Sequence, residues 1–111
     1  MNISIIGGTG GMGEGFALRW VVNHDITIGS RDAQKAATSA EQYLKTASAS
    51  YGNNIKGTIR GADYISSSKD SDILILSIPY DSVKLTCESI SGSLKKDCII
   101  VSPIVPMERN D

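Results

Sequence analysis

The start of the chain, where an apolar run breaks into a glycine-rich turn, constrains the fold more than any other segment. Residues 2–6 read Asn-Ile-Ser-Ile-Ile, and residues 7–13 follow as Gly-Gly-Thr-Gly-Gly-Met-Gly. Gly8, Gly10 and Gly13 match G-x-G-x-x-G, in which glycine allows a tight turn, the approach of backbone to a pyrophosphate, and close packing of helix on strand. The free amide N–H groups of the following helix would face the phosphates. We therefore predict a dinucleotide site here.

The glycine spacing alone is weak, and a glycine-rich hairpin or a helix cap is the plain alternative. The position of the turn, between a strand-like run and a helical pattern, favours the dinucleotide. The other phosphate-binding loop, G-x-x-x-x-G-K-[ST], is excluded because Glu14 stands where that loop needs its lysine. The predicted loop residues are Gly8, Thr9, Gly10, Gly11, Met12 and Gly13.

Length and charge limit the classes of function. The 111 residues suit one small domain, and the formal net charge is −1 with 11 scattered Lys and Arg residues. No basic face for nucleic acid or anionic lipid is expected, and no apolar run approaches the roughly 18 residues of a membrane span. Cys87 and Cys98 lack C-x-x-C spacing, so we expect both to be reduced and no metal site. We expect a cytoplasmic protein that binds small molecules.

Strand and helix signals alternate along the whole chain. The expected strands are residues 2–6, 26–28, 54–59, 72–78 and 98–101, and the expected helices are 11–22, 32–48, 62–69 and 81–90. The third strand is the weakest, because Gly57 interrupts it. Alternation of this kind predicts an α/β fold: a Rossmann-type, doubly wound parallel sheet of five strands in the order 3-2-1-4-5, within a single domain. Its switch point lies between strands 1 and 4.

Two aromatic residues on the first helix have two interpretations. Phe16 and Trp20 recur at helical spacing beside Ala17 and Val21. They could form a stacking platform for a base, but helical spacing beside a sheet favours core packing. His24, the only histidine, is expected to be structural or solvent-facing, because a lone histidine cannot assemble a catalytic triad or a metal cluster.

The end of the second strand indicates which nucleotide binds. NAD-preferring domains place a carboxylate there for the adenosine ribose, whereas this chain reads Gly29-Ser30-Arg31. Ser30 can donate a hydroxyl, and Arg31 with Lys35 one helical turn later can grip a 2′-phosphate. We therefore predict NADP. Asp32 leaves an alternative open, because it can either cap the helix or accept a hydrogen bond from the ribose. Arg31 and Lys35 can also simply face solvent at the start of the helix.

Two proline-containing loops leave strands 4 and 5. One reads Ser77-Ile78-Pro79-Tyr80, and the other runs over residues 102–107 as Ser-Pro-Ile-Val-Pro-Met. Side by side at the carboxyl edge, they would line the nicotinamide end of the cofactor. The alternative is that each proline simply ends a strand.

Taken together, the chain resembles the N-terminal domain of the coenzyme F-420 (F420)-dependent NADP oxidoreductases, also called NADPH-dependent F420 reductases. The resemblance rests on residues 5–13, on Ile28-Gly29-Ser30-Arg31 with Lys35, on residues 77–80 and on residues 100–106. It covers nearly all 111 residues, in order.

The resemblance implies that hydride passes directly between NADPH and the deazaflavin F420, so that no catalytic acid or base is needed and the protein's task is positioning. It implies pyrophosphate at residues 9–12 and the 2′-phosphate at Ser30, Arg31 and Lys35. It places the nicotinamide near Ile78, Pro79, Val105 and Met107, with Ser82 also beside the cofactor.

The chain departs from the family in three places. Ser82 stands where members can carry histidine, and Gly11 replaces a common asparagine. The segment 59–69 is longer and richer in serine than the family pattern leads us to expect. Members also continue for about as long again, with a helical domain that completes the deazaflavin site and a homodimer. We therefore expect residues 1–111 to be the NADP-binding domain, which binds cofactor without turnover. A free-standing NADP(H)-binding module, or the cofactor domain of another NADP-dependent reductase, are the alternatives.

Overall fold

Strands and helices alternate throughout the computed structural model, which describes residues 1–102. The strands are β1 (Asn2–Ile6), β2 (Asp25–Ser30), β3 (Ile59–Asp63), β4 (Ile73–Leu76) and β5 (Ile99–Val101). The helices are α1 (Gly11–Trp20), α2 (Ala33–Tyr51), α3 (Tyr64–Ser68) and α4 (Val83–Ile90). Short 3₁₀ turns occupy Gly52–Asn54, Tyr80–Ser82 and Ser91–Ser93.

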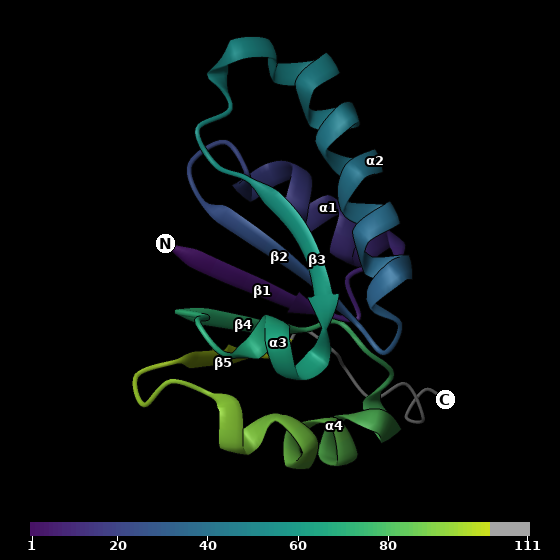
Figure 1. Cartoon of the computed structure of the whole chain (residues 1–111), viewed down its shortest axis with the longest axis vertical. Coiled ribbons are helices and arrows are strands. Elements are labelled where there is room, and N and C mark those ends of the chain that lie inside the picture. The colour runs from purple at the N-terminus through teal and green to yellow at the C-terminus, as the bar shows by residue number, and fades with distance from the viewer. Residues whose placement is uncertain (103–111) are drawn as a thin grey trace, which may run out of the picture.

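The five strands form one parallel sheet in the order β3-β2-β1-β4-β5, which confirms the predicted topology. β1 lies at the centre, so the connections leave it toward both sides and the carboxyl ends of all strands meet at one edge (Figure 1). In parallel sheets of this kind ligands bind at that edge, beside the strand where the order reverses. The fold thus brings the glycine turn after β1 to the switch point.

The sheet separates two hydrophobic cores, and alternate residues of β1 and β4 contribute to both. One face of the sheet packs against α1 and α2, and the other packs against α3 and α4 (Figure 1). The first core contains Ile3, Ile5, Ala17, Val21, Ile26, Ile28, Ala36, Ala40, Tyr43, Ala47, Ile59 and Ile75. The second contains Ile6, Leu74, Leu76, Ile78 and Ile90. Phe16 and Trp20 stack with ring centroids 4.9 Å apart and pack against the first core, as predicted.

The predicted bounds of the third strand, residues 54–59, were wrong: residues 55–58 are irregular, and β3 runs from Ile59 to Asp63. The amide of Gly57 donates to the carbonyl of Val21 at 2.9 Å. A side chain at Gly57 would collide with the carbonyl of His24. The glycine therefore marks a close approach of backbone to the α1–β2 turn, and the strand begins only after it.

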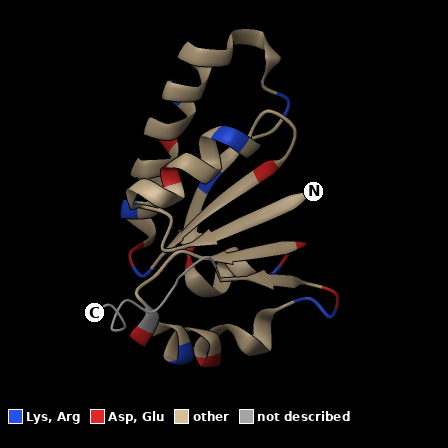
Figure 2. Ribbon diagram, turned by 180° about the vertical axis from the view of Figure 1, so that it is seen from behind, with Lys and Arg blue, Asp and Glu red and all other residues tan. Residues whose placement is uncertain are grey.

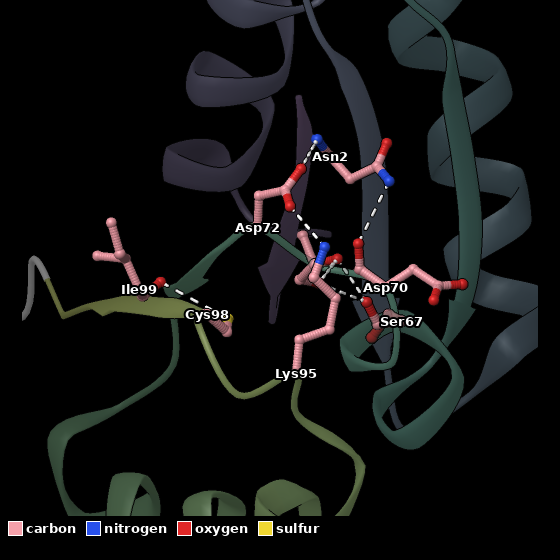
Figure 3. A network of polar contacts seen from close by, with 9 residues as sticks. Asn2, Ser67, Asp70, Asp72, Lys95, Cys98 and Ile99 are labelled. Carbon is pink, nitrogen blue, oxygen red and sulfur yellow. Dashed lines mark hydrogen bonds and ion pairs between the residues drawn. The ribbon is translucent and has the colours of Figure 1, made fainter.

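A polar network fixes the amino edge of the sheet (Figure 3). The Asp72 carboxylate accepts from the amide of Asn2 at 2.8 Å and from Lys95 Nζ at 2.6 Å. These two partners lower the pKa of Asp72, the Asn2 amide most. The network ties the starts of β1 and β4 to the segment before β5, so it holds the edge opposite the candidate site.

Candidate functional site

The turn after β1 is held against the end of β4. Gly7 has φ of 78°, a left-handed conformation that favours glycine, and its amide donates to the carbonyl of Gly29 at 2.8 Å. A Cβ at Gly7 would collide with the carbonyl of Ser77 and with the side chain of Ile78. Gly7, outside the G-x-G-x-x-G pattern, is thus what lets the loops after β1 and β4 meet.

The three glycines of the pattern have different surroundings. A Cβ at Gly13 would collide with the backbone of Gly8, and one at Gly8 would lie 2.9 Å from the carbonyl of Ile5. These two glycines let α1 pack closely on β1. A Cβ added at Gly10 or at Gly11, by contrast, would meet nothing within 4 Å, so open space surrounds both positions. No contact inside the fold therefore requires a glycine at position 10. A phosphate that approaches the backbone closely would require one.

In the first turn of α1, no side chain of the N-cap residue accepts a hydrogen bond from the backbone amides. Its N-cap is Gly10, which makes no side-chain hydrogen bond to the helix, and the amides at a helix start lack partners within the helix. Thr9 is half-buried and Met12 is 51% exposed. The loop therefore presents backbone donors next to open space, which suits a pyrophosphate.

Tyr43 supports this loop from α2, and sequence reasoning missed it. Its hydroxyl donates to the carbonyl of Gly8 at 2.8 Å, and the residue is 5% exposed. Burial raises the pKa of Tyr43, and the charge of Glu14 raises it further, against a hydrogen bond with Ser39 that lowers it. The protonated hydroxyl is therefore the stable form, and it links α2 to the glycine loop.

The segment after β2 places the residues predicted for a 2′-phosphate. Asp32 caps α2, accepting from the amides of Gln34 at 3.0 Å and Lys35 at 3.3 Å. Asp32 therefore has the helix-cap role, one of the two that the sequence left open, and both hydrogen bonds go to its Oδ1. Ser30 is half-buried at the end of β2, and its hydroxyl accepts from the Asp32 amide at 3.2 Å. Arg31 and Lys35 are exposed.

Arg31 lines two cavities at this edge, each of about 300 Å³. The one that we name the α4 cavity is lined by Arg31, Tyr64, Asp81, Ser82, Leu85, Thr86 and Ser89. The one that we name the α3 cavity is lined by Arg31, Asp63, Tyr64, Ile65 and Ser89. The structure thus brings together Arg31 and Ser82, two predicted site residues about 50 positions apart in the sequence.

The remaining predicted residues fall into two groups. Ile78 is 7% exposed and belongs to the second core, with its side chain next to Gly7. Pro79 is exposed. Val105 and Met107 lie outside the described residues. The nicotinamide assignment of these four residues stays a prediction.

Elsewhere on the described surface, a cavity of about 450 Å³ lies between α2 and β3, and another cavity opens beside Trp20. It measures about 320 Å³, lies on the α1 face and is lined by Met1, Ile3, Trp20, His24, Ile73, Ile75 and Val101. Basic and acidic residues are scattered over the described ribbon (Figure 2). Within residues 1–102, no three His, Cys, Asp or Glu residues group as metal ligands, and no helix is long and apolar enough to cross a membrane. Cys87 and Cys98 are free thiols, as predicted.

Comparison with known proteins gives consistent relatives. A family model described as "NADP oxidoreductase coenzyme F420-dependent" matches residues 2–106. The F420-dependent NADP reductase of Methanocaldococcus jannaschii is 38% identical over 110 residues, which cover 96% of this chain and 46% of that protein. The enzyme of the same name from Methanothermobacter thermautotrophicus is 33% identical and is covered to 44%. The chain therefore spans somewhat less than half the length of these curated relatives.

Solved structures share the fold at low identity. A diketoreductase superimposes with a TM-score of 0.71 at 17% identity, over 92% of this chain and 41% of its own. A lactate dehydrogenase from Eimeria maxima, solved with NADH and oxamate, superimposes with a TM-score of 0.71 at 13% identity, over 95% of this chain and 36% of its own. At these identities the likeness establishes the Rossmann-type fold.

The Tyr43 hydrogen bond predicts a measurable loss of stability. Tyr43→Phe leaves the Gly8 carbonyl without its donor, and we expect the free energy of unfolding in urea to fall by about 1–2 kcal/mol at neutral pH. Tyr51→Phe, which alters an exposed tyrosine at the end of the same helix, is the control and should change it little.

The same pair of variants has a pH signature. Because the folded pKa of Tyr43 is raised, the stability that it contributes is complete below the unfolded pKa and is lost as pH rises through the folded pKa. From about pH 9 to about pH 11, around the ordinary tyrosine pKa, Tyr43→Phe should lose less stability than the unmutated protein. Equal losses would show that the Tyr43 hydroxyl is not held as described.

Proposed function

Because this chain belongs to the family of coenzyme F420-dependent NADP oxidoreductases, we propose that its carboxyl edge binds NADP(H) for hydride transfer to or from F420. The pyrophosphate lies over the loop from Thr9 to Met12, and the 2′-phosphate lies against Ser30, Arg31 and Lys35. The observation that carries the proposal is the open space at Gly10, next to uncapped helix amides. The space at Gly10 supports a ligand there, because no internal contact fills it.

Preference for NADP over NAD follows from the end of β2. The end of β2 carries Ser30 and Arg31 where NAD-preferring domains have a carboxylate, and Asp32, the next residue, uses Oδ1 to cap α2. Arg31 offers a planar set of donors at the mouth of two cavities. Each charge-assisted hydrogen bond to phosphate contributes about 1.5–3 kcal/mol. One such bond favours NADP by about tenfold or more.

The bound nicotinamide supplies the hydride chemistry in such a reductase. The contribution of this chain is positional. The Ser77 amide donates to the Ile6 carbonyl at 2.8 Å, which ties the β4 loop to the start of the glycine turn, and Tyr43 ties the turn to α2. Two loops that cannot shift independently hold a reactive ring in one orientation. We propose that Ile78, Pro79, Val105 and Met107 flank that ring and that Ser82 contacts the cofactor.

We extend the proposal to a protein of the relatives' length, of which this chain spans somewhat less than half: a further domain completes the F420 site, and the protein forms a homodimer and works in the cytoplasm. β5 supports the first part, because Ile99, Ile100 and Val101 are 60%, 46% and 41% exposed at the edge of the sheet. Exposed apolar residues on an edge strand are typical of a surface that further structure covers.

The phosphate assignment predicts a change in selectivity. Calorimetric titration should show that the chain binds NADP at least tenfold more tightly than NAD, and Arg31→Ala should remove most of that difference. Arg19→Ala is the matched control, because Arg19 is an exposed arginine in the last turn of α1, away from this edge. Equal affinities of the unmutated chain for NADP and NAD would contradict the role of Arg31.

The role in hydride transfer predicts that the full-length protein and residues 1–111 alone differ in activity. Mixed with NADPH and oxidised F420, the full-length protein should bleach the deazaflavin absorbance, whereas residues 1–111 alone should give little or no turnover. Robust turnover by residues 1–111 would show that the F420 site does not need a further domain. Failure of the full-length protein to bleach F420 would refute the proposed substrate.

A further inference from the structure

The face of the sheet that carries α1 and α2 is covered unevenly. These two helices pack over β1, β2 and β3, and their buried residues belong to the first core. Seen from behind, no helix of residues 1–102 lies over β4 and β5 (Figure 2). Parallel sheets are normally covered on both faces. The part of this face over β4 and β5 is therefore available for further structure.

Apolar side chains occupy this uncovered area. Ile73 pairs with Ile99 and Ile75 pairs with Val101, so these side chains point to one face of the sheet. Ile99 is 60% exposed and Val101 is 41% exposed. Met1, which shares the α1-face cavity with Val101, is 61% exposed. We name this area the β5 surface; it consists of Met1, Trp20, Ile73, Ile99 and Val101.

The α1-face cavity adjoins the β5 surface and contains an unsatisfied polar atom. Apart from His24, its walls are apolar or aromatic, and it measures about 320 Å³. Nδ1 of His24 is buried and has no hydrogen-bond partner within residues 1–102. Buried polar atoms in proteins are normally paired, because an unpaired one destabilises the fold. The cavity thus has room for an apolar side chain and an atom that needs a hydrogen bond.

We propose that the β5 surface is where the further domain of the full-length protein docks. A helix of that domain packs its apolar side on β4 and β5, places a side chain in the α1-face cavity and hydrogen-bonds to Nδ1 of His24. The inference rests on the proposed function, which includes a further domain, and it says where that domain attaches.

The length of the relatives and the path of the chain favour this occupant. The chain covers 46% and 44% of two relatives, so more than half of a protein of that length lies outside it. Connections between parallel strands are right-handed. A connection that extended the sheet beyond β5 would therefore place its helix on the same face as α4. Structure that covers the β5 surface has to come from outside this sheet, which a separate domain can provide.

Ile99→Lys tests the docking surface by limited proteolysis of the full-length protein. A buried, unpaired ammonium group would weaken the contact, and we expect the connection between the two domains to be cleaved about tenfold faster. In residues 1–111 alone the same substitution should leave the affinity for NADP unchanged, because lysine is well tolerated on an exposed edge strand. Leu44→Lys is the matched control, since Leu44 is an exposed apolar residue of α2 outside the β5 surface. It should not alter cleavage.

His24 gives a second test in which the two lengths of protein respond in opposite directions. In residues 1–111, His24→Leu removes the unpartnered Nδ1, so the urea midpoint should not fall. In the full-length protein, the same substitution removes a hydrogen bond between the domains and should speed cleavage. His24→Asn keeps a polar atom near the position of Nδ1 and should be cleaved as slowly as the unmutated protein.

The outcomes separate this inference from the proposed function. If residues 1–111 bind neither NADP nor NAD, the assignment of the cofactor fails, and the cleavage rates still decide the docking surface. Unchanged cleavage of the Ile99→Lys and His24→Leu variants of the full-length protein would overturn the docking surface and leave NADP binding intact. If Ile99→Lys instead splits a full-length dimer into monomers in light scattering without faster cleavage, a second copy occupies the β5 surface and the inference is wrong.

Discussion

The close contact between Gly8 and Gly13 is the constraint on which the candidate site depends. A Cβ on Gly13 would overlap the backbone of Gly8, so α1 can begin directly above the end of β1 only because neither residue has a side chain. That approach leaves the first amides of α1 at the centre of the carboxyl edge, where the strand order reverses. The contacts of Gly7 with β4 and of Tyr43 with Gly8 then fix the same loop from both sides of the sheet.

Most of the fold could be predicted from the sequence, because its signals are local. β4 is an almost continuous apolar run between polar residues, and α2 has an alanine stripe over four turns, so burial and periodicity identify both. β3 could not be identified in this way. It lies at the edge of the sheet, and its Gly61 is needed because the backbone of α2 at Ala36 packs directly on it. A glycine required by a neighbouring helix lowers the strand signal that the sequence carries.

The candidate site was predictable where neighbouring residues build it and not where distant ones do. The glycine loop and Gly29-Ser30-Arg31 are continuous motifs, and the structure places them at the same edge. Tyr43 meets Gly8 across 35 positions, and Tyr64 joins Arg31 only through the packing of α3. Tyr43 did leave a trace, since it is one bulky aromatic in a stripe otherwise dominated by alanine, but no sequence pattern names its partner.

The central claim is that the carboxyl edge of this sheet binds NADP. The most direct test follows the backbone amide resonances of the ¹⁵N-labelled chain while NADP is added. The account predicts that the largest shifts fall at Gly8–Gly13, Ser30–Lys35 and the residues that line the α4 cavity, with little change around Trp20 and His24 at the α1-face cavity. Shifts confined to Trp20 and His24, or no shifts at saturating NADP, would contradict it.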